Sequence, residues 1–521
     1  MIKVVTISLS PADAADEQIV KRTLAGECAV GIKRINGYDI QKRSIDARSR
    51  QPRIIIQAQV FIDEQPVAPL PFDPQLQNVS NAPHVVIVGA GPAGIFAALR
   101  LITLGYKPII LERGKDVRSR RRDLAAMNKE GIVNPESNYC FGEGGAGTYS
   151  DGKLYTRSTK RGNVQRILQL FHHFGAEENI LYDAHPHIGT NKLPQIITAM
   201  REQIIDCGGE VLFDTKLTDI LLEGDKIKGV QTAGGTTINC QSVILATGHS
   251  ARDIFELLHR KGIAIESKPF ALGVRIEHPQ YIVDQAQYHC QVRDPYLPPA
   301  SYSLVAQEYG RGVFSFCMCP GGIIAPAATA PGEIVVNGWS PSKRNNPYAN
   351  SGTVVAVDEH DFAKHKFTGP LAAMQYQQMV EQQAFKVGGG KLVAPAQRMA
   401  DFVDNKVSST LPNCSYLPGI HTAAIRDVLP KDVNEALRKA VVDFGKKMKG
   451  YYTNEAVLVA TESRTSSPVR IPRDKETLQH IQIKGLYPCA EGAGYAGGIV
   501  SAAIDGERCA EAAVGTYTSR I

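Results

Sequence analysis

Three glycines and one acidic residue form the pattern with the clearest chemical meaning in this sequence. Gly89, Gly91 and Gly94 have the spacing G-x-G-x-x-G, and Glu112 follows 18 residues after the last of them. In such a pattern the first glycine permits a tight turn and the second lets the backbone approach a pyrophosphate. The third lets a helix pack close to a strand, and the acid hydrogen-bonds a ribose. The pattern predicts a dinucleotide-binding site.

The surrounding residues predict the elements that would position this site. Residues 85–88 are an apolar run typical of a buried strand, and residues 93–104 are mostly apolar, as in a helix packed on a sheet. A second apolar run, residues 108–111, ends at Glu112. The start of the helix would present free N–H groups and the positive end of its dipole to phosphates. Strand, turn, helix, strand and acid together are far more specific than the glycines alone.

A second glycine-rich segment, "CFGEGGAGTYSDGKL", occupies residues 140–154. Gly142, Gly144 and Gly147 repeat a similar spacing. No strand precedes them and no acid follows at the right distance, so we do not expect a second nucleotide-binding fold there.

The C-terminal segment "CAEGAGYAGGI" joins an acid to another group of glycines. Glu491 ends a strand-like run, and the four glycines after it allow close approach of a large ring. The helix expected over residues 499–513 would place its positive N-terminal end beside that ring. Such a helix end favours a ring that gains negative charge on reduction.

Candidate catalytic side chains are less clearly marked. Cys317 and Cys319 alternate on a strand-like run, which predicts that both sulfurs face one side. One interpretation is a redox or nucleophilic thiol, with Cys319 favoured because it adjoins the turn at Pro320. The other is a pair of small buried core residues.

His187, with His185 in "DAHPHIG", could shuttle protons because histidine titrates near neutral pH, or it could be a structural residue of a proline turn. Arg464 could hold an anionic substrate through its guanidinium fork, or form a salt bridge with Glu462 or Glu491. No C-x-x-C pair and no third ligand near "HPH" occur, so we expect no metal site.

Several segments resemble those of known flavoproteins. "VVIVGAGPAGIFAALR", "VILATG" and "CAEGAGYAGGI" resemble the three fingerprints of FAD-dependent oxidoreductases of the glutathione reductase type. "CFGEGGAGTYSDGKL", "AHPHIGTNKL", "FSFCMCPGG" and "ESRTSSPVRI" resemble a narrower group, the bacterial and plant FAD-utilizing dehydrogenases, a family largely uncharacterised in substrate. The resemblance covers most of the chain from residue 84 onward and implies FAD as the cofactor.

The resemblance also implies which positions hold FAD. The first glycine group would contact the pyrophosphate, Glu112 the adenosine ribose, and Arg113 would lie beside the adenine. Glu491 and Gly492 stand where many relatives have Gly-Asp. The full implied set is Gly89, Ala90, Gly91, Pro92, Ala93, Gly94, Glu112, Arg113, Gly144, Gly145, Ala146, Gly147, Leu217, Thr247, Gly248, Glu491, Gly492, Gly498 and Ile499.

The expected fold class is α/β. A Rossmann-like FAD-binding domain of the three-layer ββα type would comprise residues 84–255 and 455–521. An α+β substrate or cap domain would be inserted over residues 256–454. A small α+β domain, of ferredoxin-like character, would occupy residues 1–65, joined by a proline-rich linker over residues 66–83.

Composition sets the broad class and the compartment. The chain has 521 residues, 43% hydrophobic and 21% charged, with a net charge of +6, as in a soluble globular protein. There is no apolar run of 18 residues, no secretion signal and no paired cysteine motif. We therefore expect a cytoplasmic protein with reduced thiols and no membrane partner. The basic run at Arg118, Arg120, Arg121 and Arg122 predicts a solvated helix face near a phosphate ligand.

The favoured function is an FAD-dependent dehydrogenase or reductase acting on a small organic substrate, of anionic character given the surplus of Lys and Arg. No second strand–turn–helix unit for NAD(P)H is evident, so either NAD(P)H binds transiently as electron donor or the substrate itself reduces the flavin. One alternative is a flavin monooxygenase using NAD(P)H and O2, and another is a redox-neutral flavin enzyme. A flavin-bound, RNA-associated protein using Lys33, Arg34, Lys42, Arg43, Arg48, Arg50 and Arg53 ranks below these, because nucleic acid is not an expected partner.

Overall fold

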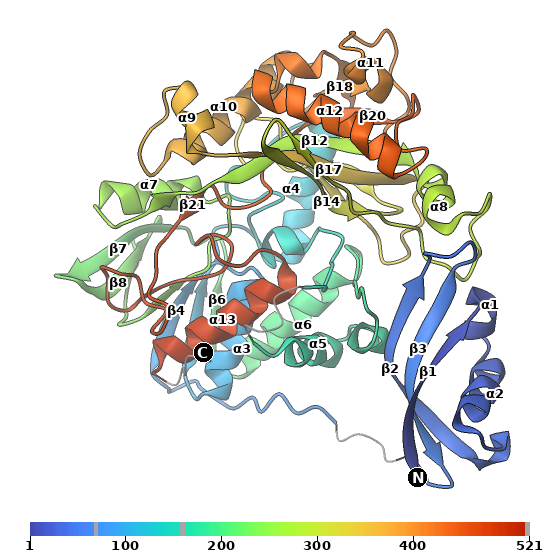
Figure 1. The fold of residues 1–521 in the computed structure, drawn as a ribbon. Helices are drawn as coiled ribbons and strands as arrows, with labels where there is room; N and C mark the ends of the chain where they lie inside the picture. Colours follow the sequence, from blue (N-terminus) through green and yellow to red (C-terminus); the bar gives the residue numbers. More distant parts are fainter. Residues whose placement is uncertain (67–70, 157–161, 516–521) are drawn as a thin grey trace.

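The computed structural model of the protein describes residues 1–66, 71–156 and 162–515. Residues 67–70 of the predicted linker 66–83 lie outside the described residues. Figure 1 shows a front domain that stands beside the rest of the chain, a lower part built on a parallel sheet, and an upper part built on a larger mixed sheet.

The lower part contains a five-stranded parallel sheet assembled from distant segments of the chain. The strand order places a C-terminal strand beside the strand of the "VILATG" segment, which in turn pairs with the first strand of the dinucleotide motif. In sheet order the strands are β22 (Leu486–Pro488), β10 (Val243–Leu245), β4 (His84–Val88), β5 (Lys107–Leu111) and β6 (Glu210–Leu212).

This sheet is the middle of three layers. Val85 and Ile87 pack with helices, whereas Val86 and Val88 pack with an antiparallel meander and α7 (Arg252–Arg260), because successive strand residues point to opposite faces. The meander strands are β7 (Leu217–Glu223), β8 (Lys226–Thr232) and β9 (Thr237–Asn239), and the helices are α3 (Pro92–Thr103), α5 (Val164–His173), α6 (Leu193–Asp206) and α13 (Ile499–Ala513). The predicted Rossmann-like, three-layer ββα fold is confirmed.

The upper part contains a seven-stranded mixed sheet with α10 (Ala372–Val387) and α12 (Lys431–Lys447) beside it (Figure 1). Its strands in order are β13 (Val305–Glu308), β14 (Arg311–Cys319), β17 (Tyr348–Val357), β12 (Phe270–Pro279), β20 (Val457–Glu462), β18 (Ala394–Arg398) and β19 (Ile420–Thr422). β20 begins after the predicted domain boundary at residue 455, yet it pairs with β12 and β18 inside this sheet. The chain therefore returns to the lower part only after β20.

Shorter elements complete the upper and connecting regions. Two small sheets pair β15 (Ile323–Pro326) with β16 (Val336–Trp339), and β11 (Glu266–Ser267) with β21 (Val469–Arg470). The remaining helices are α4 (Val117–Glu130), α8 (Gln280–Tyr288), α9 (Glu359–Lys364) and α11 (Met399–Val403). None of the helices in the described ranges has the length and apolar character needed to cross a membrane.

The front domain is a three-stranded antiparallel sheet covered by two helices. Its strands follow the order β1 (Ile2–Leu9), β3 (Arg53–Ile62) and β2 (Ile35–Asp46), with α1 (Pro11–Ala14) and α2 (Glu17–Cys28) packed on one side. The edge strand β2 contacts the lower part. Arg43 Nε donates to Asp183 Oδ1 at 2.7 Å, and the backbone of Arg43 bonds to Tyr182 and Ala184.

Helices α3 and α13 cross so closely that one glycine decides whether they can pack. A Cβ placed on Gly506 of α13 would overlap the carbonyl oxygen of Ala93 in α3. We expect Gly506→Ala to force the helices apart and to lower the free energy of unfolding by about 1–3 kcal/mol. Chemical denaturation followed by circular dichroism measures this change.

Gly26 of α2 supplies the matched control, because it is also helical but a Cβ there would meet nothing within 4 Å. Gly26→Ala should leave stability unchanged or raise it by up to about 1 kcal/mol, since alanine is the better helix former. A Gly506→Ala variant as stable as the unmodified protein would contradict the close contact of α3 with α13.

Candidate functional site

One large cleft lies where the ends of β4 and β10 meet the upper sheet. It encloses about 1540 Å³, counting the space that opens to solvent, and its walls come from all three FAD fingerprints and from β14 and β16. Of the residues implied to bind FAD, those that line it are Gly89, Gly91, Pro92, Ala93, Glu112, Arg113, Gly145, Ala146, Gly147, Leu217, Thr247, Gly248, Glu491, Gly498 and Ile499. Ala90, Gly94, Gly144 and Gly492 stand behind this wall.

The glycines of the first motif are required by close backbone contacts. Gly89 has φ +106°, and a Cβ there would lie 2.4 Å from the Ala246 carbonyl oxygen. A Cβ on Gly94 would overlap the carbonyl oxygen of Gly89. Side chains at either position would therefore separate α3 from the strand ends and fill the space beside the turn.

Arg120 holds the second glycine-rich segment in place. Its side chain is completely buried, and its guanidinium donates to the carbonyl oxygens of Asn138, Tyr139, Glu143 and Gly145 at 2.6–3.0 Å. The prediction of a solvated basic helix face is therefore wrong for Arg120, although the other three arginines of that run are exposed. The role of Arg120 is therefore to donate hydrogen bonds to loop carbonyl oxygens and not to contact a phosphate.

Glu112 ties the two glycine-rich segments together. Its carboxylate is 5% exposed and accepts hydrogen bonds from the backbone N–H groups of Ala90 at 2.8 Å, Gly114 at 2.9 Å and Gly142 at 3.0 Å. It also lines the cleft. Its contact with a ribose stays a prediction, but its position at the carboxyl end of β5 is the one that such a contact needs.

The residues of the cleft fit a bound FAD. Thr247 Oγ1 is buried at the cleft wall and has no hydrogen-bond partner in the described residues. Gly492 lies so close to Gly248 that a Cβ would come within 2.6 Å of the Gly248 carbonyl oxygen, which keeps that wall flat. An unpartnered hydroxyl and a flat glycine wall are what a large polar cofactor would complete.

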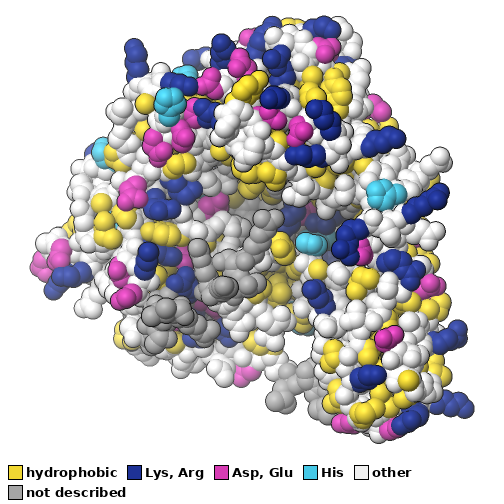
Figure 2. Space-filling model, in the orientation of Figure 1, with side chains coloured by type: hydrophobic (Ala, Val, Ile, Leu, Met, Phe, Trp, Pro, Cys, Tyr) yellow, Lys and Arg dark blue, Asp and Glu magenta, His cyan; other side chains and the backbone are white. Residues whose placement is uncertain are grey.

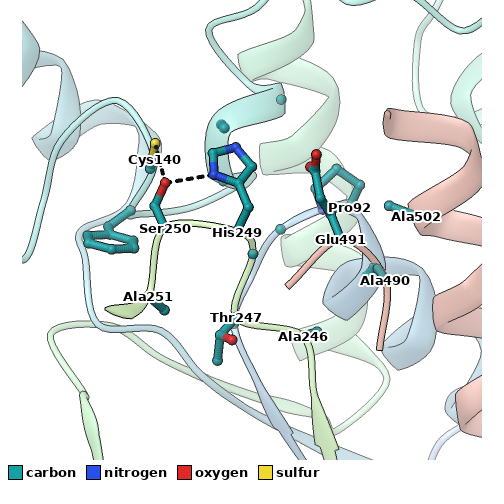
Figure 3. A pocket seen from close by; sticks show the side chains of 18 of the residues that line it. Pro92, Cys140, Ala246, Thr247, His249, Ser250, Ala251, Ala490, Glu491 and Ala502 are labelled. Atoms are coloured by element: carbon teal, nitrogen blue, oxygen red, sulfur yellow. Dashed lines mark hydrogen bonds between the residues drawn. The ribbon is translucent and has the colours of Figure 1, made fainter. Parts of the chain in front are cut away.

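His249 is a functional candidate that the sequence analysis missed. It follows the "ATG" segment, lines the cleft, and lies beside Ser250 in Figure 3. Ser250 Oγ donates to Cys140 Sγ at 3.4 Å and lies 2.8 Å from His249 Nδ1. Burial lowers the pKa of His249 to about 4, helped by Arg464 and Arg252, so the ring is neutral at pH 7.

Glu491 reaches the same cleft from the C-terminal fingerprint (Figure 3). Burial raises its pKa to about 7, against the opposing influence of Lys268. The carboxyl group can therefore hold or release a proton near neutral pH.

The two cysteines of "FSFCMCPGG" have different environments. A register shift between Phe316 and Cys319, where β14 pairs with β17, interrupts the strand alternation, and Cys317 has φ +47°. Cys317 is exposed and lines the cleft, whereas Cys319 is fully buried and does not. The two thiols stay close enough to hydrogen-bond to each other, but the thiol that lines the cleft is Cys317 rather than the favoured Cys319.

Arg464 is engaged inside the protein. Its guanidinium donates to Glu381 at 3.0 Å, to Glu333 at 3.2 Å and to Thr329 at 2.6 Å, and its side chain is almost entirely buried. Its salt-bridge partners are thus Glu381 and Glu333, not the predicted Glu462 or Glu491. A guanidinium with these bonds has little capacity left to anchor a substrate.

His187 lies outside the cleft, with Nε2 3.1 Å from the Ser342 carbonyl oxygen. Burial, with Arg344, lowers its pKa. The residue that pairs with it in an isolated bridge, Lys153, does line the cleft and was not predicted. His187 therefore supports the cleft wall from behind.

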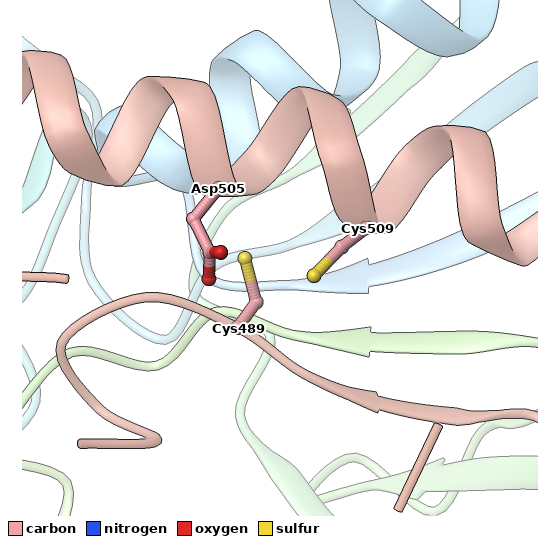
Figure 4. Close-up of side chains that lie close together, drawn as sticks. All are labelled: Cys489, Asp505 and Cys509. Carbon is pink, nitrogen blue, oxygen red and sulfur yellow. The ribbon is translucent and has the colours of Figure 1, made fainter. Parts of the chain in front are cut away.

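A group of three potential metal ligands lies beneath α13. Cys489, Asp505 and Cys509 are buried with their ligand atoms within 4.8 Å of one another (Figure 4). Asp505 already receives two hydrogen bonds from Arg473, at 2.7 and 2.9 Å, and one from the Ala490 N–H. A metal ion would compete with this guanidinium, so we assign the group to the attachment of α13 rather than to metal binding.

Comparisons with known proteins agree with the cleft. The fold and the fit of the cleft define an FAD-binding protein, and residues 269–465 match the model of a family described as "FAD-dependent protein, C-terminal domain-like". Residues 1–61 match a domain of unknown function. An uncharacterized protein of Clostridium beijerinckii is 40% identical over 529 residues, covering 98% of both chains. The chain belongs to the family of this protein, a family of FAD-dependent proteins.

Other similarities are partial. A thiamine thiazole synthase of Aeropyrum pernix is 29% identical over 147 residues, 28% of this chain and 42% of that protein. Among solved structures, glycine oxidase from Bacillus cereus has a TM-score of 0.34 at 14% identity, covering 84% of this chain and 98% of that one. The flavin-dependent brominase Bmp2 has a TM-score of 0.36 at 14% identity, covering 83% of this chain and 79% of that one. We draw no argument from likenesses at this level.

The arginine network gives the first prediction for the site. Arg464→Ala would leave Glu381 and Glu333 buried with Arg252 as their remaining cation. We expect a loss of about 3–5 kcal/mol in the free energy of unfolding. Arg22→Ala, at an exposed position in α2, is the control and should change stability by less than about 0.5 kcal/mol. A stable Arg464→Ala protein would return Arg464 to the candidates for substrate binding.

Glu491 predicts a pH dependence. In the unfolded chain a glutamate ionises near pH 4.3, whereas Glu491 keeps its proton to about pH 7 when folded. Its contribution to stability is therefore fully present below about pH 4.3 and is lost as pH rises through 7. The melting temperature of Glu491→Gln minus that of the unmodified protein should rise across this interval and then level off. Glu476→Gln, at an exposed site, should show no such trend, and a flat difference for Glu491→Gln would contradict the raised pKa.

Proposed function

We propose that the protein is an FAD-dependent oxidoreductase, a dehydrogenase or reductase of a small organic substrate. The observation that carries the proposal is the shared cleft, whose walls combine the three FAD fingerprints with Cys317 of the upper sheet and Asn337 of β16. A small molecule that binds on the upper-sheet side of the cleft would share the cleft with the cofactor. When bound, FAD would accept or donate a hydride or electrons there.

The protein's own groups suit proton transfer and orientation. His249 is a neutral imidazole at the cleft wall, bonded to Ser250, and can exchange a proton with a substrate O–H or N–H group. Glu491 can accept or return a proton near neutral pH. Acid and base groups whose pKa values are moved apart by their surroundings are typical of catalytic sites.

Lys153 supports a substrate of anionic character. Its side chain lines the cleft, and its carboxylate neighbour Asp151 is 3.8 Å away and is bound mainly by Arg344 at 2.6 Å. Burial disfavours the charge of Lys153, but Cys317, Cys319 and Asp151 together raise its pKa above the usual value. A charged ammonium group is therefore available to a carboxylate or phosphate of the substrate.

The RNA-associated alternative finds little support in the front domain. Arg34, Arg43 and Arg48 are paired with Asp63, Asp183 and Asp46 respectively. On the face shown in Figure 2, Lys and Arg side chains are scattered among Asp and Glu rather than gathered in one patch. A flavin monooxygenase remains the nearest alternative, distinguished by NAD(P)H oxidation that depends on an aromatic substrate and gives a hydroxylated product.

An anaerobic visible spectrum of the purified protein tests the proposal. We expect flavin absorption bands. Gly89→Ala should lose them, because its Cβ would clash with the Ala246 carbonyl oxygen. Gly31→Ala is the control and should keep them, because a Cβ there would meet nothing within 4 Å. Titration with NADH and then NADPH follows. Bleaching by one nucleotide would indicate a reductase or monooxygenase, and indifference to both would indicate reduction by the substrate itself. A colourless protein that cannot be reconstituted with FAD would refute the proposal.

A further inference from the structure

Cys317 has an exposure that no other cysteine in the chain shares. All ten cysteines lie in the described residues, and Cys317 is the exposed one; six are buried, and Cys140, Cys290 and Cys414 are intermediate. Its exposure is to the cleft, whose wall it forms with Lys153 and Asn337. The bulge in β14 and the positive φ of +47° turn it out of the strand's regular alternation.

Positive groups surround the segment that carries this thiol. Lys153 Nζ donates to the Met318 carbonyl oxygen, and Arg275 Nη1 donates to the Cys317 carbonyl oxygen at 2.9 Å. The charge of Arg275 is partly offset by Glu462, whose carboxylate is 3.1 Å from Arg275 Nε. Two further carboxylates lie near the thiol: Asp151 is held by Arg344, and Glu491 lines the same cleft, where its pKa is raised by burial. Lys153 is thus the cation that is both beside Cys317 and open to the cleft.

The neighbouring Cys319 adds a second stabilising contact. Its thiol is fully buried and lies near the Cys317 thiol, with Sγ 3.4 Å from the Cys317 carbonyl oxygen. A hydrogen bond between the two thiol side chains, with the charges of Lys153 and Arg275, lowers the pKa of Cys317 well below its usual value. An exposed thiol beside cations is the environment of a reactive cysteine, whereas structural cysteines are buried in apolar surroundings.

We propose that Cys317 is a nucleophilic thiolate that binds small anionic electrophiles covalently within the cleft. Its ligand class is an unsaturated carbonyl compound carrying a carboxylate or phosphate. In the addition, a bond forms between Cys317 Sγ and the β-carbon while the C=C π bond breaks. The electron pair moves onto the carbonyl, and a proton from water completes the saturated adduct. No electron is gained or lost overall, so the step needs no oxidant, and Lys153 holds the anionic group.

Alkylation rates test this proposal with two probes that differ in charge. Iodoacetate and iodoacetamide form the same kind of S–C bond and release iodide, and peptide mass spectrometry assigns the modified cysteine. At pH 7 we expect Cys317 to react at least about tenfold faster than Cys140, Cys290 or Cys414, because the thiolate fraction sets the rate. Relative to free glutathione, Cys317 should favour iodoacetate. Cys317→Ser should abolish the fast phase, and Cys290→Ser should retain it.

Variants of the flanking residues separate activation from simple exposure. Lys153→Met should raise the midpoint of the pH–rate profile of Cys317 and remove its preference for iodoacetate, whereas Lys3→Met in β1 should change neither. Cys319→Ala should also raise the midpoint, because it removes the hydrogen-bond donor that stabilises the Cys317 thiolate. These readouts depend on the ionisation of Cys317 and not merely on its accessibility.

Three results would overturn the proposal. One is a pH–rate midpoint for Cys317 at or above about 8.5, the value of an ordinary thiol. Another is a Cys317–Cys319 disulfide in the protein as isolated, revealed by alkylation before and after reduction. The third is protection of Cys317 by saturating FAD, which would mean that the cofactor covers the thiol. Flavin content is measured in the same samples, so a missing flavin would count against the proposed oxidoreductase alone.

Discussion

The close approach of backbone segments at the carboxyl ends of β4 and β10 is the constraint on which the cleft depends. Gly89 touches Ala246 from the next strand, Gly94 touches Gly89, and Gly506 of α13 touches Ala93 of α3. Each contact excludes even a methyl group. Because the contact of Gly506 with Ala93 joins segments more than 400 residues apart in the chain, the N- and C-terminal fingerprints can form one cofactor cradle only when the parallel sheet is complete.

Buried arginines stabilise this arrangement because each one is matched to internal acceptors. Arg120 is matched to loop carbonyls, Arg464 to Glu381 and Glu333, and Arg473 to Asp505. A buried guanidinium is costly unless its donors are satisfied, so most of the hydrogen-bonding capacity of these side chains is used inside the protein, even for Arg464, which lines the cleft. Lys153 also lines the cleft but differs because its side chain is 36% exposed. The electrostatic character of the site therefore comes from a residue that composition and motif reading pass over.

The sequence predicted the features that depend on local pattern. The strand–turn–helix unit and the C-terminal acid, glycines and helix follow from spacing and apolar periodicity, and the three-layer fold follows from the resemblance to FAD-dependent oxidoreductases. What it could not predict depends on long-range packing. The bulge in β14 that gives Cys317 and Cys319 different environments arises from pairing with β17, and the burial of Arg120 arises from a loop folded over α4. The place of β20 in the upper sheet was not predicted, because the strands with which it pairs, β12 and β18, lie far from it in sequence.

His249 illustrates the same limit at the level of chemistry. A histidine after "ATG" carries no recognisable spacing, and its candidacy rests on its place at the cleft wall, its lowered pKa and its contact with Ser250, which meets Cys140 only in the fold. The sequence signal favoured His187 instead, since "HPH" brings two imidazoles together. In the structure that segment supports the cleft. The Leu154 N–H donates to the Pro186 carbonyl oxygen, and the Ile188 N–H donates to the Gly152 carbonyl oxygen.

The front domain reaches the cleft through this same segment. Arg43 of β2 bonds to Tyr182, Asp183 and Ala184, and the chain then continues to Pro186 and Ile188, which hold Gly152 and Leu154 beside Lys153. The path from β2 to the cationic wall is therefore short and made of backbone hydrogen bonds, which resist displacement more than exposed side-chain pairs do. A domain with no residue in the cleft lining thus contributes to the cleft by fixing the strand-like segment on which Lys153 stands.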